Sequence, residues 1–180
     1  MFGFLRRKRR DATIAHLHDA IVAAAREPRL YGEGGFRDSV DERFEALTLH
    51  VLLVLRRLRE LPAPAAEVAQ ELVDSVFAHI EAGMRETGVG DMGVPKKMKK
   101  LGRAFYDRTA KYEAALEDRD AAALGAELAR RLGRQDGMDG LAAYLLGSVK
   151  TLSGQDLAGL LERPAFAEPA RIGGAGENIA

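Results

Sequence analysis

The sequence predicts an all-α protein, a single-domain helical bundle of about six to seven helices. Apolar residues recur three and four positions apart along most of the 180 residues, and no clear run shows the period of two expected of a strand. The glycine-rich and proline-rich stretches fall mainly between these periodic blocks. With 47% apolar and 30% charged residues, the chain can bury one hydrophobic core.

The first two predicted helices are separated by a proline. We expect a helix over about residues 11–26, which Pro28 stops. Ser39 followed by Glu42 is the capping-box pattern that begins a helix. The apolar residues after this cap, between residues 44 and 58, cover more than one helical face. We therefore expect this second helix at the centre of the bundle.

Two further long helices follow. Pro62 and Pro64 break the chain before a helix expected at about residues 65–86, and a glycine-rich loop at residues 88–93 precedes another at about 95–117. The loop has the glycine spacing of a phosphate-binding loop, but valine and proline stand where that motif needs lysine and serine or threonine. We interpret its glycines as allowing a sharp reversal between two helices.

The last third of the chain predicts shorter helices at about residues 120–132, 138–151 and 153–162. Asp120 can cap the first of these, and the pattern Ser153-x-x-Asp156 can cap the last. From residue 164 the composition turns to alanine, glycine, proline and glutamate without periodicity. We therefore expect a helical domain over residues 11–163 and a flexible tail over residues 164–180.

Two blocks of cations are concealed by a formal net charge of zero. Residues 1–10 and residues 96–103 each hold five cations and no acid, and the rest of the chain has 17 basic and 27 acidic residues. Such islands on an acidic body indicate local contact with an anionic or electron-rich partner. A nucleic-acid-binding protein would show a more general basic coating, so we do not expect nucleic acid as the partner.

The second block is costly for folding. Lys96, Lys97, Lys99 and Lys100 come directly after Pro95, in the first turns of a predicted helix. The helix dipole favours anions there, and each exposed cation costs roughly 0.3–1 kcal/mol. A charge run on a helix is most often a solvated face, but a feature that folding disfavours suggests a binding partner.

The first block follows three large apolar side chains and could touch a membrane surface. In that interpretation Phe2, Phe4 and Leu5 enter the bilayer while the cations meet anionic headgroups, namely Arg6, Arg7, Lys8, Arg9 and Arg10. The alternative is a disordered basic leader. The start lacks the apolar run and cleavage site of a secretory signal, and the longest uncharged apolar runs are too short to cross a bilayer. We expect a cytoplasmic protein. If it binds a membrane, we expect it to be peripheral on the inner membrane.

The sequence shows no evident catalytic or metal-binding site. The chain has no cysteine, which excludes disulfides and thiolate metal sites and agrees with a reducing cytoplasm. His16 and His18 are two residues apart, so on a helix they point in nearly opposite directions and cannot chelate one metal. His50 and His79 lie inside helical patterns, where packed or surface histidines are commoner than ligands. Without a nucleophile motif either, we expect no enzyme, no metal and no cofactor.

Four segments together resemble a known family. They are RFEALTLHVLLVLRRL (residues 43–58), QELVD with Phe77 after it, RETGVGDMGVPKKMKK (residues 85–100) and AFYDRTAKYEAAL (residues 104–116). Over about residues 30–132 the chain is similar to the ubiquinol–cytochrome c chaperones, which assist assembly of respiratory complex III. The resemblance implies an all-helical, non-enzymatic bacterial member that binds cytochrome b, in some cases together with a small helical partner protein.

The resemblance also implies a binding surface. The matched positions are Arg85, Glu86, Gly88, Gly90, Asp91, Lys97, Met98, Lys100, Phe105, Tyr106 and Arg108. Phe105 belongs to an apolar stripe that we expect in the core. With the charges considered, the predicted partner-binding residues are Arg85, Glu86, Asp91, Lys96, Lys97, Lys99, Lys100, Arg103, Tyr106 and Arg108. Asp107 departs from the family pattern, which has glycine there.

Two other functions stay open. A membrane-surface or ribosome-associated adaptor would use the two basic blocks to meet phosphate groups. A haem or quinone binder would need only an apolar groove, and the sequence offers little else in its favour.

Overall fold

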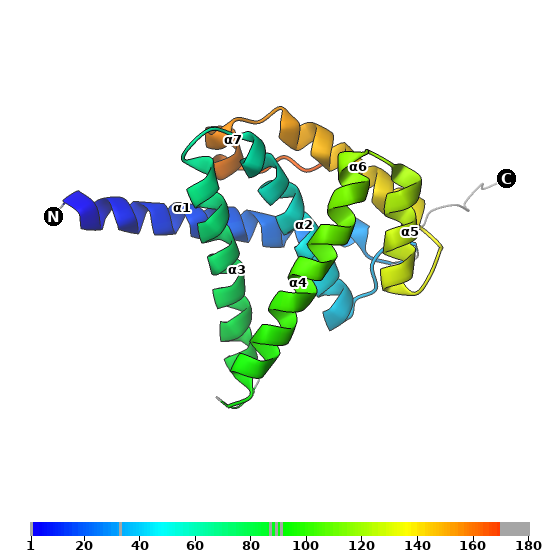
Figure 1. The fold of residues 1–180 in the computed structure, drawn as a ribbon, viewed down its shortest axis with the longest axis horizontal. Helices are drawn as coiled ribbons and strands as arrows, with labels where there is room; N and C mark the ends of the chain where they lie inside the picture. The colour runs from blue at the N-terminus through cyan, green and yellow to red at the C-terminus, as the bar shows by residue number, and fades with distance from the viewer. Residues whose placement is uncertain (1, 33, 87, 89, 91, 170–180) are drawn as a thin grey trace.

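The computed structural model describes residues 2–32, 34–86, 88, 90 and 92–169, with side chains from residue 10 onward in these ranges. Within this part of the chain, seven α-helices and one short 3-10 helix enclose a single core (Figure 1). The elements are α1 (Phe2–Ala25), η1 (Pro28–Leu30), α2 (Val40–Glu60), α3 (Ala65–Glu86), α4 (Val94–Glu117), α5 (Ala121–Leu132), α6 (Met138–Ser153) and α7 (Leu157–Glu162). The predicted all-α bundle is confirmed.

Helix α2 is the centre of the bundle, as its wide apolar face predicted. It packs against α1, α3, α4 and α6. Leu49, Val51, Leu52, Leu53 and Val54 are all buried, although consecutive helical residues point in different directions. The other helices therefore cover α2 on several sides, and their positions are set by it.

The cap of α2 also anchors a distant loop. The Ser39 hydroxyl accepts the Glu42 N–H at 3.3 Å, which is half of the predicted capping box. The Glu42 carboxylate does not return to Ser39; it accepts the Arg37 N–H at 2.7 Å and two hydrogen bonds from Arg134, both at 2.8 Å. Burial alone would raise the pKa of Glu42, but these donors outweigh burial and lower it. The start of α2 is thus tied to the connection between α5 and α6.

Two of the shorter helices differ in how well their caps were predicted. Asp120 accepts the Ala123 N–H at 2.9 Å at the start of α5, and Gly133 ends that helix at a φ of 68°, which glycine adopts without strain. At α7 the predicted Ser153 start is wrong, because α6 continues through Ser153. The cap is Asp156, which accepts the Gly159 N–H at 2.8 Å.

The N-terminal leader is part of a helix rather than a separate segment. Helix α1 begins at Phe2, nine residues before the predicted start at residue 11, and its first turns project beyond α3 (Figure 1). Arg10, a predicted membrane contact, instead lies 2.9 Å from Glu67 and 2.7 Å from Glu71 of α3. The side chains of the other predicted contacts, from Phe2 to Arg9, are outside the described part of the chain. No described helix is both long enough and apolar enough to cross a membrane.

The segment after α7 packs on the core over residues 164–169, which differs from the predicted flexible tail. The Ala167 N–H donates to the Ser148 hydroxyl at 3.0 Å, and the Thr151 hydroxyl donates to the Ala165 carbonyl at 2.6 Å. Pro164 is buried. We call residues 164–169 the C-terminal strap, and residues 170–180 lie outside the described part.

His50 lies beneath this strap and is fully buried. Its Nδ1 donates to the Ala46 carbonyl at 2.7 Å, so its Nε2 accepts from the Tyr144 hydroxyl at 2.8 Å. The Phe166 ring packs edge-on against the imidazole, with centroids 4.9 Å apart. Burial lowers the pKa of His50 to about 4, although the hydrogen bond to Ala46 acts in the opposite direction.

This buried imidazole predicts a pH-dependent stability. The unfolded chain protonates His50 at its ordinary pKa of 6.5, whereas the folded protein resists protonation until about 4. The contribution of neutral His50 is therefore complete above pH 6.5 and is lost as the pH falls toward 4. We expect the free energy of unfolding to drop by about 2 kcal/mol between pH 7 and pH 5 from this group.

Urea unfolding followed by circular dichroism would measure the drop, since the chain has no tryptophan. The variant His50→Gln keeps a donor and an acceptor but cannot titrate, so its stability should change much less over the same range. Equal changes in the two proteins would contradict the prediction.

Candidate functional site

The five cations of the second block lie at the start of α4, as predicted. The helix begins at Val94, has Pro95 in its first turn and no acidic residue there, and Gly93 before it supplies no side-chain cap. Each of the five cations is exposed. The structure records no ion pair between them and any other described residue. Their charge is therefore uncompensated at the helix end where the dipole disfavours it.

These cations belong to an arm formed by the end of α3 and the start of α4, residues 77–104. The two helices converge at a tip that projects away from the other helices (Figure 1). Val94 is the only described residue of the arm that is buried. At the base of the arm the Phe77 and Phe105 rings meet edge-on, with centroids 5.5 Å apart. The arm thus contributes little to the core and exposes most of its surface.

Beside the base of the arm lies a groove of about 450 Å³, which we call the α2–α3–α4 groove. Its lining includes Leu52 and Leu55 of α2, Ala69 and Val73 of α3, and Tyr106 and Ala110 of α4. Tyr106 is 61% exposed, whereas Phe105 is buried as predicted. An apolar groove with an exposed aromatic side chain has the composition of a protein contact surface.

The predicted site residues do not all lie on this surface. Lys96, Lys97, Lys99, Lys100 and Arg103 are on the arm, and Glu86 is exposed near its tip. Arg85 is partly engaged, because its guanidinium lies 2.8 Å from Glu81 in the same helix. Asp91 is outside the described residues.

Arg108 is partly buried, with 17% of its side chain exposed. Its Nε is 2.6 Å from Oε2 of Glu45, whose side chain is only 4% exposed, and its guanidinium lies 4.8 Å from the Phe44 ring centroid. The Nε–H makes no hydrogen bond, so this contact is a charge pair. The Tyr112 hydroxyl donates to the other Glu45 oxygen at 2.6 Å. We therefore assign Arg108 a structural role joining α4 to α2, in place of the predicted partner contact.

Asp107 also has a structural contact. It lies 2.6 Å from Arg131 of α5 and 3.4 Å from Lys111 of its own helix. The hydrogen bond from Arg131, together with the charge of Lys111, lowers the pKa of Asp107 despite some desolvation. The residue that departs from the family pattern thus links α4 to α5.

The groove was missed by the sequence analysis, although one signal for it was present. The apolar residues of α2 cover more than one face, and Leu55 is only partly covered in the structure. A helix with more apolar surface than its own bundle covers can indicate a binding groove. The signal did not reveal which helices form the walls.

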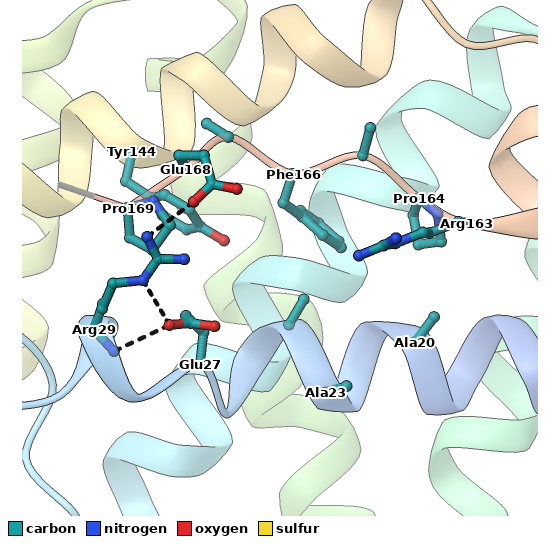
Figure 2. Close-up of a pocket in the computed structure, with 13 residues that line it drawn as sticks. Ala20, Ala23, Glu27, Arg29, Tyr144, Arg163, Pro164, Phe166, Glu168 and Pro169 are labelled. Carbon is teal, nitrogen blue, oxygen red and sulfur yellow. Dashed lines mark hydrogen bonds and ion pairs between the residues drawn. The ribbon is translucent and has the colours of Figure 1, made fainter.

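A second cavity, of about 590 Å³, lies between α1 and the C-terminal strap (Figure 2). Ala20 and Ala23 of α1 lie on one side of it, and Phe166 of the strap points in from the other. At one end Arg29 lies 2.7 Å from Glu27 and 2.9 Å from Glu168. Arg29 of η1 thus bridges two carboxylates and links the strap to the segment after α1.

The fold and this surface describe an all-helical protein whose most prominent exposed feature is a cationic arm beside an apolar groove. The model of the family described as ubiquinol-cytochrome C chaperone matches residues 33–166. The chain is also similar to the crystal structure of the Cbp3 homolog from Brucella abortus, with a TM-score of 0.82 and 33% identity over 95% of this chain and 98% of that one. No curated protein matches. The chain belongs to the ubiquinol-cytochrome C chaperone family. The match runs past residue 132, where the predicted resemblance ended, and includes α6, α7 and the start of the strap.

The role of Arg108 can be tested through stability. Arg108→Met removes the counter-charge of a buried carboxylate, and we expect the free energy of unfolding to fall by about 3 kcal/mol. Lys97→Ala on the exposed arm should change it by less than about 0.5 kcal/mol. Adding Glu45→Gln to Arg108→Met should restore part of the loss, because no buried charge then lacks a partner. A loss in Arg108→Met no larger than in Lys97→Ala, measured by urea unfolding, would refute the structural role.

Proposed function

We propose that the protein is a non-enzymatic assembly chaperone of respiratory complex III that binds cytochrome b, or an assembly intermediate containing it, through the cationic arm. Family membership is the observation that carries this proposal. The arm supports the proposal. Uncompensated cations at a helix N-terminus reduce the stability of the fold, so a binding partner explains their presence better than folding does. The chaperone acts at the cytoplasmic face of the inner membrane, where it meets its client.

The arrangement suits the holding of a client rather than its chemical conversion. The groove offers apolar contact and the arm beside it offers positive charge. Charge steers encounter and rejects mismatched partners, while affinity comes from the buried apolar and aromatic contacts. A small helical partner protein could share this surface or add to it.

A second candidate is a membrane-surface or ribosome-associated adaptor. The projecting first turns of α1, whose sequence carries the first basic block, favour it (Figure 1). Such an adaptor would bind bare anionic vesicles or ribosomes, and the binding would fall steeply with salt.

Affinity purification from detergent-solubilised native membranes tests the proposal. The tagged parent chain should recover cytochrome b, and a variant with Lys96, Lys97, Lys99, Lys100 and Arg103 all replaced by glutamine should recover about ten-fold less. Assembled complex III should fall in cells that carry only the variant. The variant should fold at least as stably as the parent, because it removes cations from a helix N-terminus.

A control variant replaces two exposed cations elsewhere, Arg26→Gln with Lys150→Gln, and should retain cytochrome b. If the parent recovers no cytochrome b, or the arm variant recovers as much as the parent, the proposed client or its binding surface is wrong. Recovery of ribosomes or lipid alone would favour the adaptor.

A further inference from the structure

The walls of the α2–α3–α4 groove have the spacing of a helix-packing surface. Its α3 wall includes Ala66, Ala69 and Val73, and its α4 wall includes Tyr106 and Ala110, at intervals of three and four residues. Side chains at these intervals form the ridges between which another helix packs. Beyond the Phe77 and Phe105 contact the two helices diverge (Figure 1). Leu52 and Leu55 of α2 line the groove between them. The groove is therefore shaped for a third helix that lies along α3 and α4.

Four of the five cations at the start of α4 divide into two sets relative to this groove. Successive residues of an α-helix are about 100° apart, so Lys99 and Arg103 lie within about 20° and 60° of Tyr106 around α4. Lys100 and Lys97 lie about 120° and 180° from Tyr106, on the side where Asp107 contacts Arg131 of α5. Lys99 and Arg103 thus border the direction in which the groove opens, whereas Lys97 and Lys100 do not.

The two ends of the groove differ in charge. At the end away from the tip, Arg59 lies 2.7 Å from Glu113, and Glu113 also pairs with Arg56, so both arginines have a carboxylate partner. At the end toward the tip, Lys99 and Arg103 have no ion-pair partner among the described residues. A ligand that fills the groove therefore gains more from negative charge at the end near Lys99 and Arg103, which pair with no carboxylate in the described part of the chain, than at the end where Glu113 already pairs with the arginines.

We infer that the α2–α3–α4 groove binds an amphipathic helix of a partner protein, with its apolar face on Tyr106 and Ala110 and an acidic end over Lys99 and Arg103. This is the helix-in-groove mode of recognition, in which apolar anchors at helical spacing supply affinity and charges at the rim set orientation. The inference deepens the proposed function by stating what kind of client segment the arm holds and which cations contact it.

The experiment uses the full chain and a designed probe, so that it does not depend on cytochrome b. The probe is a fluorescent synthetic peptide of about five helical turns, with leucine and alanine on one face and three glutamates at one end. A second peptide has three lysines in place of the glutamates. Fluorescence anisotropy should show the glutamate peptide binding at least about ten-fold more tightly.

Two double variants with the same charge and on the same helix then test the division of the cations. Lys99→Gln with Arg103→Gln should weaken binding of the glutamate peptide about ten-fold, and Lys97→Gln with Lys100→Gln less than about two-fold. Ala110→Phe should block the groove and abolish binding, whereas Ala143→Phe on the exposed side of α6 should not. Equal effects of the two double variants, equal affinity for both peptides, or unchanged binding in Ala110→Phe would each overturn the inference.

The outcomes separate this inference from the proposed function. If the peptide binds as described but no cytochrome b is recovered from membranes, the groove is a helix-binding site and the proposed complex III client is wrong. If recovery of cytochrome b depends on the arm but the peptides do not bind selectively, the proposed function stands and the groove is not a helix-binding site.

Discussion

The structure depends on the buried carboxylate of Glu45, which Arg108 and Tyr112 hold against α2. A carboxylate removed from water is stable only if a counter-charge and hydrogen bonds compensate it, and both come from the second half of α4. Glu113, paired with Arg56 and Arg59, joins the same two helices. The first half of α4 has no such anchor to α2. It extends with α3 as the arm, which leaves its cations in water and the groove open beside its base.

The elements with local determinants were predictable from the sequence. Ser39 and Asp120 are caps because their side chains reach a backbone N–H three residues ahead, and Gly133 ends α5 through its own left-handed conformation. Pro95 is a local signal as well, because proline favours the first turn of a helix, and it correctly placed the lysines at the start of α4. The centre of the bundle was predictable too, since only a helix covered on several sides can bury so many adjacent apolar residues.

What the sequence did not reveal was which charges meet one another. Arg10 and Arg108 look like surface cations in a list of residues, yet their acidic partners lie 57 or more positions away and meet them only through the packing of helices. The same holds for the strap, whose alanine and proline composition resembles a tail but whose backbone hydrogen bonds go to α6. The candidate site was therefore predictable as a cationic segment, and its groove and the two sets of cations were not.

The C-terminal strap has a consequence for synthesis. It covers His50 and Tyr144, and Arg29 of η1 reaches Glu168 within it, so the segment after α1 is held by residues that are made after all the described helices. Translation proceeds at about 5–20 residues per second, and helices α2, α3 and α4 can pair while the ribosome is still working. The cover over His50 is complete only once the strap has emerged, because Phe166 of the strap packs on the imidazole. During synthesis His50, which is fully buried in the folded protein, therefore stays accessible to water until the strap covers it.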